Sequence, residues 1–222
     1  IPLSFKGQLT RPTVLKYIPK TVSFIMNDRE IRGFYQLTTE IESTSFIALV
    51  GLLKIVLHHY SGNDKIVVGF PIAGRQYAEL EKQLGLYINM LPLKSTITGK
   101  ETLYEFVKNV RNTTIEAYEH QEYPFDKIVE DLGLETDSSR TPLFDVGLNF
   151  NNTNVIQTPD IDGLNELKVQ RTFTGFSTVK SDMWLNISER KGGISVSIDF
   201  NEALFSAPFF TQFSSSYKTL LL

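Results

Sequence analysis

The chain has 222 residues, of which 41% are hydrophobic, including 16 Phe and 9 Tyr, and its formal net charge is -3. This apolar content is enough for the core of one large domain or of a lobe of a larger one, and the weakly acidic balance argues against nucleic acid as a partner. The sequence has no Cys, which excludes disulfides and thiolate metal sites and is compatible with a reducing, cytoplasmic compartment.

No segment has the length of a membrane span or the layout of a signal peptide. The longest apolar run, Phe46–Leu57, is interrupted by Lys54 and is too short to cross a bilayer. Ile1–Pro12 does not resemble a signal peptide, and the chain does not begin with Met. We therefore expect no membrane partner, and we expect the chain to be a fragment or a processed product.

The first 20 residues are predicted to be a linker or an extended arm. They hold Pro2, Pro12 and Pro19 and show no periodicity. The first regular element is a predicted strand at Thr21–Met26, where the side chains alternate in character.

Two helices and a buried strand are predicted next. Asn27 or Asp28 can cap a first helix, whose apolar residues recur at helical spacing: Ile31, Phe34, Leu37 and Ile41. Thr44 can cap a second helix, from Ser45 to about Tyr60, which is apolar nearly all round and is therefore expected to be buried on most faces. The continuous apolar run Ile66–Phe70 is typical of a strand inside a sheet.

The middle of the chain is predicted to be mixed. Residues 71–85 form a polar connection with a short helix around 79–83, and residues 86–97 are mostly extended. Thr102 and Glu105 form a capping-box pair for a long helix that runs to about His120. Pro124 suits the first turn of another helix, residues 125–132, which Gly133 ends.

The last third is predicted to hold the remaining strands and a closing helix. We expect a strand at 143–150, a loop rich in Asn, Thr and Pro at 151–162, a hairpin of strands 183–188 and 194–200, and an amphipathic helix at 205–222. Strands and helices alternate without the regular spacing of a doubly wound sheet. The fold class is therefore α/β in the broad sense (α+β), with helices packed on a mixed β-sheet.

Three segments resemble known sequence motifs, and they occur in the same order as in one protein family. Leu84–Leu93 (LGLYINMLPL) is similar to a pattern Gly-x-Phe-Val-Asn-Thr, His120–Asp126 (HQEYPFD) to His-Gln-Asp-x-Pro-Phe-Glu, and Asp137–Phe144 (DSSRTPLF) to Arg-Asp-x-Ser-Arg-x-Pro-Leu-Phe. These are the fifth, sixth and seventh core motifs of the condensation domains of non-ribosomal peptide synthetases, which this chain resembles. Residues 60–75 and 180–222 are also similar to that family, so the resemblance covers nearly the whole chain.

The resemblance implies a chloramphenicol-acetyltransferase-like fold of two lobes with a tunnel between them. Donor and acceptor peptidyl carrier domains insert phosphopantetheine arms from opposite faces, and the enzyme itself binds no cofactor or metal directly. The catalytic motif His-His-x-x-x-Asp-Gly lies in the N-terminal lobe, which would end roughly where this chain begins. Residues 1–20 would then be a linker or arm from the missing N-terminal lobe, and residues 21–222 the C-terminal lobe.

The resemblance also assigns site residues. Arg140 is expected to form a salt bridge with the Asp of the absent motif and so to support the catalytic loop, unless it is an ordinary surface arginine. Asn89 either lines the tunnel and bonds a backbone or pantetheine amide, or satisfies a strand end. Tyr87 belongs to the same tunnel segment, and Arg75, after the Gly74 turn, is placed near the tunnel floor.

The chain departs from the motifs at several positions, and one loop has two interpretations. Thr136 stands where the seventh motif has Arg, Met90 where the fifth has Thr, and Tyr87-Ile88 where it has Phe-Val. Met90 puts a polar role at that position in doubt. The loop 151–162 is either the latch that reaches the other lobe in this family or a mobile surface loop.

His58 and His59 do not form the catalytic motif. Asp64 comes one residue too late for it, and no Gly follows. The two histidines end a predicted helix, where a polar or cationic side chain can meet free carbonyls. His120 also ends a helix, so we favour a capping or interface role for it. Adjacent histidines on a helix point apart, so the spacing supports no metal site.

The family reaction is amide formation between two tethered substrates, and holding both in one tunnel would supply much of the acceleration. We expect this chain to be one half of such an enzyme and to be inactive alone, since it lacks the histidine motif. Two other interpretations stay open. The chain is a non-catalytic carrier-binding or scaffold module, or it is half of a related acyltransferase of the same superfamily that acts on an alcohol or a soluble thioester.

Overall fold

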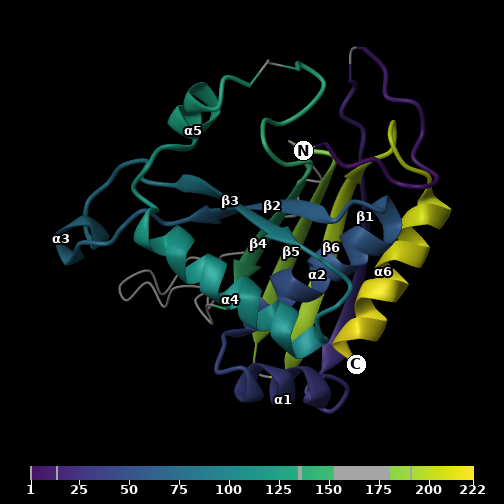
Figure 1. Cartoon of the computed structure of the whole chain (residues 1–222), viewed down its shortest axis with the longest axis horizontal. Coiled ribbons are helices and arrows are strands. Elements are labelled where there is room, and N and C mark those ends of the chain that lie inside the picture. The colour runs from purple at the N-terminus through teal and green to yellow at the C-terminus, as the bar shows by residue number, and fades with distance from the viewer. Residues whose placement is uncertain (1, 14, 135–136, 153–180, 191) are drawn as a thin grey trace, which may run out of the picture.

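The computed structural model describes residues 2–13, 15–134, 137–152, 181–190 and 192–222, which form one mixed sheet with helices packed on it (Figure 1). The strands are β1 (Pro19–Asn27), β2 (Lys65–Ile72), β3 (Asn89–Thr96), β4 (Val146–Asn151), β5 (Met183–Arg190) and β6 (Gly193–Asn201). The helices are α1 (Arg32–Glu40), α2 (Ser45–Ser61), α3 (Ala78–Glu81), α4 (Leu103–Glu119), α5 (Phe125–Asp131) and α6 (Ala207–Leu221). The predicted fold class is confirmed.

The sheet has the strand order β1-β6-β5-β4-β2-β3. Strand β4 runs parallel to β2 and to β5, and the other neighbours are antiparallel. The predicted hairpin is the β5–β6 pair, in which Arg190 is opposite Gly193. Every second residue is buried from Met183 to Ile187 in β5 and from Ile194 to Phe200 in β6. This alternation turns one face of each strand toward the core.

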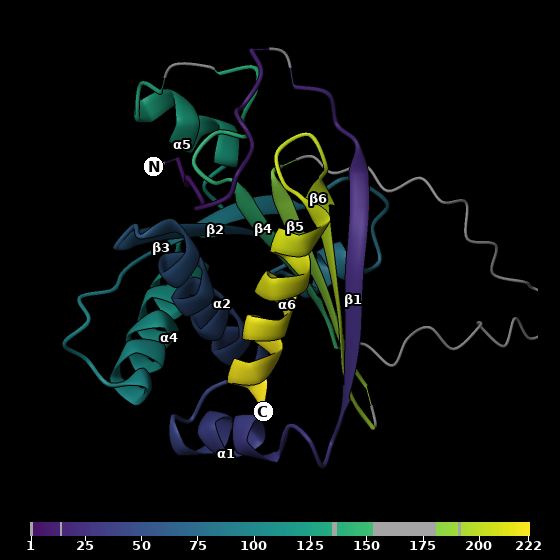
Figure 2. The same cartoon turned by 90° about the vertical axis from the view of Figure 1, so that its right-hand side faces the viewer.

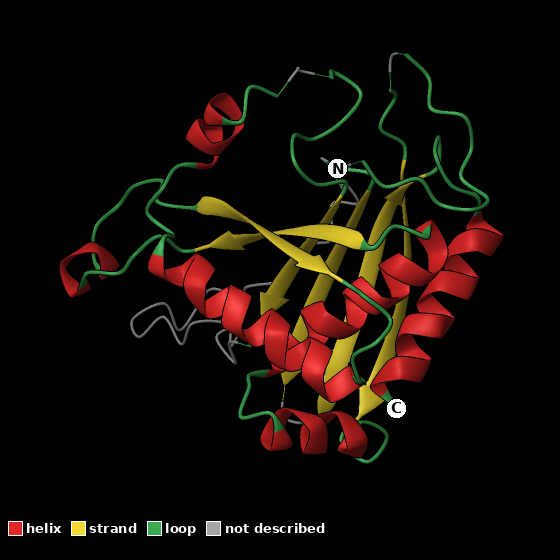
Figure 3. Ribbon diagram, in the orientation of Figure 1, coloured by secondary structure: helices red, strands yellow, loops and turns green. Residues whose placement is uncertain are grey.

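Helices α2, α4 and α6 lie on the same side of the sheet, and α1 lies across the end of that layer (Figures 2 and 3). Helix α2 contacts α1, α4, α6 and β2, so the predicted helix without a polar face is indeed enclosed. Its ends are also as expected. The Thr44 side chain accepts the Ile47 amide at 3.4 Å, and Gly62, at φ 69°, follows the last turn and donates its N–H to His58 O.

Aromatic side chains fix α6 against the sheet and α2. Phe210 of α6 stacks on Phe200 of β6 with 3.7 Å between ring centroids. The buried hydroxyl of Tyr217 donates to Leu49 O in α2 at 3.0 Å, which satisfies a polar group that burial would otherwise leave without a partner.

The capping box of α4 is confirmed, but neither Asn27 nor Asp28 caps the first helix, because α1 begins at Arg32 with Ile31 as its N-cap. The predicted starts of β4 and α5 also differ from the structure. Thr102 and Glu105 exchange the two expected hydrogen bonds. The strand predicted from residue 143 begins at Val146, because Leu143 has φ 71° and Phe144 N–H donates to Pro142 O at 2.9 Å. A tight turn therefore precedes the strand. Pro124 lies just outside α5 as its N-cap rather than in its first turn.

The described residues before β1 form no helix or strand, but they pack against the rest of the fold. Leu3 and Phe5 are buried in the core. Lys6 N–H donates to Tyr60 O at 3.1 Å, and Leu9 N–H donates to Leu204 O at 2.8 Å. The division into an arm at 1–20 and a lobe at 21–222 stays a prediction, with the arm packed against the lobe.

Two further expectations concern the membrane and the loop at 151–162. In the described ranges no single helix has the length and apolar character of a membrane span, and only α1 and α2 taken together, bent by 107°, meet those criteria. Beyond Asn151 and Asn152 the loop lies outside the described residues, so its two interpretations stay as they were.

Lys54 lies in the interior of α2 and is fully buried. Its Nζ donates to Leu93 O at 2.9 Å and to Ser95 Oγ at 2.7 Å, both in β3. Burial lowers the pKa of Lys54 from 10.5 to about 7, because an ammonium group is poorly solvated there.

This pKa predicts a pH-dependent stability. Between pH about 7 and 10.5 the unfolded chain binds more protons at Lys54 than the folded chain does, so stability rises with pH across that range. We expect the free energy of unfolding to rise by about 2 kcal/mol between pH 7 and 9, and Lys54→Met to remove most of this rise. Urea unfolding of both proteins at the two pH values measures it. An equal rise in the Met variant would contradict the assignment.

Candidate functional site

Arg75 organises the segment that joins β2 to β3. Its guanidinium donates to three carbonyls of that segment, namely those of Leu80, Gln83 at 2.9 Å and Gly85 at 3.3 Å. It also lies 4.4 Å from the centre of the Tyr87 ring, in a cation–π contact. Two of the predicted tunnel residues therefore contact each other, and Arg75 fixes the loop that contains α3.

Glycine is required beside Arg75. Gly74 has φ 62°, and a Cβ atom there would lie 1.9 Å from Tyr87 O. The two ends of the loop thus approach each other at the backbone.

Asn89, the first residue of β3, holds the turn between α4 and α5. Its Nδ2 donates to Gln121 O and Tyr123 O, both at 2.9 Å. Its Oδ1 accepts the amides of Met90 at 2.9 Å and Phe125 at 3.1 Å. The Phe125 amide is one of those that a helix N-terminus leaves unpaired. Asn89 therefore does more than satisfy a strand end, and its amide is occupied by backbone groups.

The predicted tunnel residues gather around one hollow of about 300 Å³ between the α3 loop and the α4–α5 turn. The hollow is lined by Gly74, Gln76, Tyr77, Leu80, Leu86, Tyr87, Ile88, Asn89, Gln121, Glu122 and Pro124. Tyr87 and Asn89 lie in its wall, and Arg75 joins it through Tyr87. Glu122 also lines a second hollow, which His120 borders.

Arg140 lies at a different hollow, of about 230 Å³, lined by Pro2, Leu134, Asp137, Arg140, Thr141, Pro142, Leu143, Phe144 and Asp145. The structure therefore does not bring Arg140 together with the tunnel residues. Its side chain is only 19% exposed, and Nη1 lies 2.8 Å from the Asp145 carboxylate. Arg140 is not an ordinary surface arginine. Its pairing with a carboxylate of another lobe stays a proposal.

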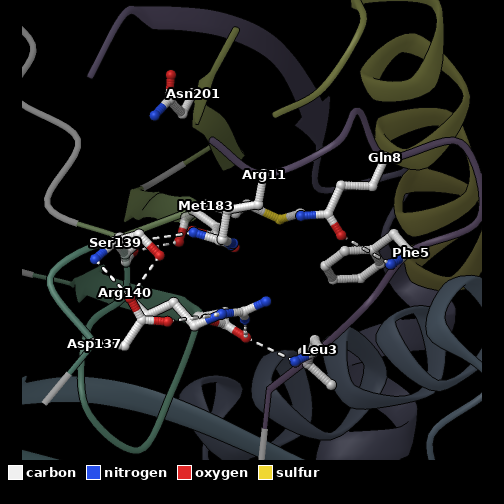
Figure 4. A network of polar contacts seen from close by, with 12 residues as sticks. Leu3, Phe5, Gln8, Arg11, Asp137, Ser139, Arg140, Met183 and Asn201 are labelled. Carbon is white, nitrogen blue, oxygen red and sulfur yellow. Dashed lines mark hydrogen bonds and ion pairs between the residues drawn. The ribbon is translucent and has the colours of Figure 1, made fainter. Parts of the chain in front are cut away.

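A second arginine, Arg11, lies in the same network (Figure 4). Arg11 forms an ion pair with buried Asp182, and its Nη1 donates to Ser139 O at 2.6 Å. Burial and the negative charge of Asp145 raise the pKa of Asp182 to about 6, while Arg11 acts in the opposite direction. Arg11 comes from the N-terminal segment, so this pair fastens that segment to the start of β5.

Sequence reasoning missed Asp145, Asp182 and Arg11. The available signal was an acid beside an apolar strand, in Phe144-Asp145-Val146 and in Asp182-Met183. A buried acid needs a cation or several donors, so each of these positions predicts a partner. The sequence does not say which arginine supplies it.

Phe144 of the third motif segment packs over Gly69 in β2. A Cβ atom at position 69 would lie 2.3 Å from the Phe144 ring, so this glycine allows the ring to approach the strand. The ring also contacts Phe125 of α5 at 5.8 Å between centroids. The segments around 125 and 144 are therefore packed together.

The three histidines lie at helix ends, where they contact the backbone or neighbouring side chains. His58 Nδ1 lies 2.9 Å from Asn63 O and 3.8 Å from the Asp64 carboxylate, at the end of α2 as predicted. His59 packs edge-on against Tyr60. His120 is the C-cap of α4. Among the described residues, no group of three or more His, Cys, Asp or Glu side chains is arranged to hold a metal ion.

The chain is similar to a known protein family. The family model described as "Condensation domain" matches residues 3–222. Gramicidin S synthase 2 of Brevibacillus brevis is 33% identical over 204 residues, which are 92% of this chain and 4% of that protein. The chain thus spans a small part of this much longer relative.

Solved structures share the fold. The X-domain from teicoplanin biosynthesis superposes with a TM-score of 0.87 at 20% identity, covering 100% of this chain and 51% of that chain. The first condensation domain of the CDA synthetase superposes with a TM-score of 0.70 at 15% identity, covering 94% of this chain and 46% of that chain. In both cases this chain matches about half of the solved chain.

The contacts of Asn89 predict a large effect of a small change. Asn89→Asp would set a carboxylate against the carbonyls of Gln121 and Tyr123, so we expect a loss of about 2 kcal/mol of stability. Urea unfolding measures this loss. The matched control is Asn149→Asp, at an exposed position of β4. Equal effects of the two changes would contradict the assigned role.

Proposed function

Since the chain belongs to the condensation-domain family, we propose that it is the C-terminal lobe of a condensation domain that forms peptide bonds between carrier-tethered aminoacyl or peptidyl thioesters. The observation that carries the proposal is the share of the related solved chains that this chain covers. The chain matches the family model over residues 3–222 but covers only about half of the two solved chains described above. A further lobe of similar size is the partner that this proposal requires.

An exposed apolar ridge supports the proposal that a second lobe packs against this chain. Leu84, Leu86 and Ile88 are 101%, 89% and 62% exposed, on alternate positions of the segment before β3. Large apolar side chains grouped at a surface mark an interaction site. In the proposed domain this ridge, held in place by the Arg75 and Tyr87 contacts, packs against the N-terminal lobe.

Arg140 supplies the proposed link to the catalytic motif. Its guanidinium has five N–H donors, lies in the wall of the 230 Å³ hollow and remains partly exposed there. A planar guanidinium can bridge two carboxylates. We propose that the Asp of the histidine motif enters this hollow and shares Arg140 with Asp145.

In the proposed reaction the acceptor amine attacks the donor thioester carbonyl. A C–N bond forms, the C–S bond breaks, the thiolate leaves on the donor carrier, and the amine loses a proton. The histidine of the other lobe would handle that proton or stabilise the intermediate. This chain would contribute position, by walling the tunnel and by holding the histidine loop through Arg140, so that two tethered groups meet in a reactive geometry.

The phosphopantetheine arms would arrive on carrier domains, and the hollow between the α3 loop and the α4–α5 turn suits such an arm in part. Its wall combines the polar side chains of Gln76 and Gln121 with exposed apolar ones, which matches a chain that carries amides and methylenes. Asn89 does not fit the role of a pantetheine ligand, because backbone groups occupy its amide. Its proposed role is to hold the wall.

The test is amide formation with two loaded carrier domains, measured by mass spectrometry of the acceptor carrier. We expect no product from the 222-residue chain alone and product from the longer protein that contains it. Arg140→Ala in the longer protein should lower turnover by about 10-fold or more, since it releases the histidine loop. Sequencing the region before Ile1 shows whether a His-His-x-x-x-Asp-Gly motif precedes the chain.

Three outcomes would contradict the proposal. Turnover by the chain alone would place the catalytic groups within it. No amide product from the longer protein, with an intact histidine motif present and both carriers bound, would favour the carrier-binding or scaffold module. Transfer to a soluble alcohol in place of the acceptor carrier would favour the related acyltransferase.

A further inference from the structure

Asp145 holds two distant groups with a single oxygen. Its carboxylate is buried, at 3% exposure, and Oδ2 accepts Arg140 Nη1 at 2.8 Å and the Leu3 amide at 2.7 Å. Figure 4 shows Leu3 and Arg140 in the same network of polar contacts. One buried acceptor therefore joins the seventh-motif segment to the N-terminal segment.

Asp145, rather than Asp137, sets the direction of the Arg140 side chain. Asp137 is the other carboxylate nearby, but its side chain is 55% exposed and lies 3.9 Å from Arg140 Nε. An exposed pair at that distance contributes little, since solvent screens it. A buried, charge-assisted hydrogen bond is shorter and stronger. The orientation of the guanidinium in the hollow therefore depends on Asp145.

The backbone around Asp145 is itself held firmly. Asp145 O accepts the Met183 amide at 3.2 Å at the start of the parallel β4–β5 pair. The preceding Phe144 ring packs over Gly69, and the following residue, Val146, begins β4. A group on such a rigid element can position another side chain precisely enough to matter for a reaction.

Leu3 brings the chain that precedes the lobe into the same arrangement. Its side chain is buried, and its amide contacts the oxygen that binds Arg140. If the N-terminal segment withdrew, the buried carboxylate would lose the Leu3 amide, one of its two donors among the described residues, and would be free to shift relative to Arg140. The seating of residues 2–5 and the orientation of Arg140 are thus linked through one atom.

We propose that Asp145 is a positioning residue, which orients Arg140 toward the catalytic motif and makes that orientation depend on the seating of the N-terminal segment. This inference rests on the proposed function, in which Arg140 supports the histidine loop. It adds a residue that touches neither substrate nor the reacting atoms and acts only through Arg140.

The kinetic test uses the longer protein and the amide-forming assay. Asp145→Asn keeps the shape of the side chain but removes its charge, so we expect kcat to fall by about 10-fold or more while KM changes by less than about threefold. The double variant Asp145→Asn/Arg140→Gln should be no slower than Arg140→Gln alone, because a residue that acts through Arg140 has no effect once Arg140 is gone. The matched control, Asp28→Asn, at an exposed position that lines neither hollow, should stay within about twofold of the unchanged protein.

A second readout does not depend on turnover. In the folded 222-residue chain, Asp145→Asn should speed hydrogen exchange at the Leu3 amide by about fivefold, as expected for losing roughly 1 kcal/mol of hydrogen bonding. Asp28→Asn should leave that exchange unchanged. A thermal unfolding curve confirms that each variant is folded before it is assayed.

The outcomes separate this inference from the function on which it rests. If the longer protein forms no amide, the proposed function fails, whereas unaltered Leu3 exchange in Asp145→Asn overturns the coupling to the N-terminal segment. If amide forms and Arg140→Gln slows it, full activity of Asp145→Asn overturns the positioning role. Additive losses in the double variant overturn it too, since they mean that Asp145 acts independently of Arg140.

Discussion

Two buried carboxylates at the start of neighbouring strands organise this fold. Asp145 precedes β4 and Asp182 precedes β5, and both are nearly inaccessible to solvent. An unpaired charge at such a depth would destabilise the fold by several kcal/mol, so each carboxylate requires a cation. Arg140 and Arg11 meet that requirement. These pairs draw the seventh-motif segment and the N-terminal segment to the same end of the sheet.

The motif side chains near the other hollow act mainly on the backbone. Arg75 is bonded to carbonyls of its own loop, and Asn89 to the turn between α4 and α5. Polar residues of this kind are easily taken for ligands of a substrate. Here they shape a wall, and the groups left to face a ligand are those of the loop and turn that they hold. The contribution of such residues to a reaction is geometric, since they fix where other groups lie.

The chain combines a well-packed interior with an exposed apolar ridge. Helix α2 is enclosed by the sheet and three other helices, and even Lys54 inside it has two acceptors in β3. By contrast, Leu84, Leu86 and Ile88 project outward from a loop that Arg75 makes rigid. A stable core beside an ordered apolar ridge is the arrangement expected for one half of a domain whose other half covers the ridge.

The sequence alone determined the local structure and the family likeness. The Thr44 cap, the Thr102–Glu105 capping box and the alternation in β5 and β6 depend on residues close together in the chain, and each was predictable from its own segment. The order of three motif segments indicated the family. The resemblance of residues 137–144 to the seventh motif also singled out Arg140 as a candidate site residue. The start of β4 was placed too early because the turn at Leu143 has no clear signature in the sequence.

Only the tertiary structure decided which polar groups meet. Arg11 pairs with Asp182 across 171 residues, the Leu3 amide reaches Asp145 across 142, and the partners of the Asn89 Nδ2 lie 32 and 34 residues away. Several arginines and aspartates could satisfy the same chemistry, and residue types do not choose among them. The choice follows from the strand order β1-β6-β5-β4-β2-β3, which sets the starts of β4 and β5 side by side and leaves the N-terminal segment beside them. Pairings between distant segments are therefore a consequence of packing, which no single segment encodes.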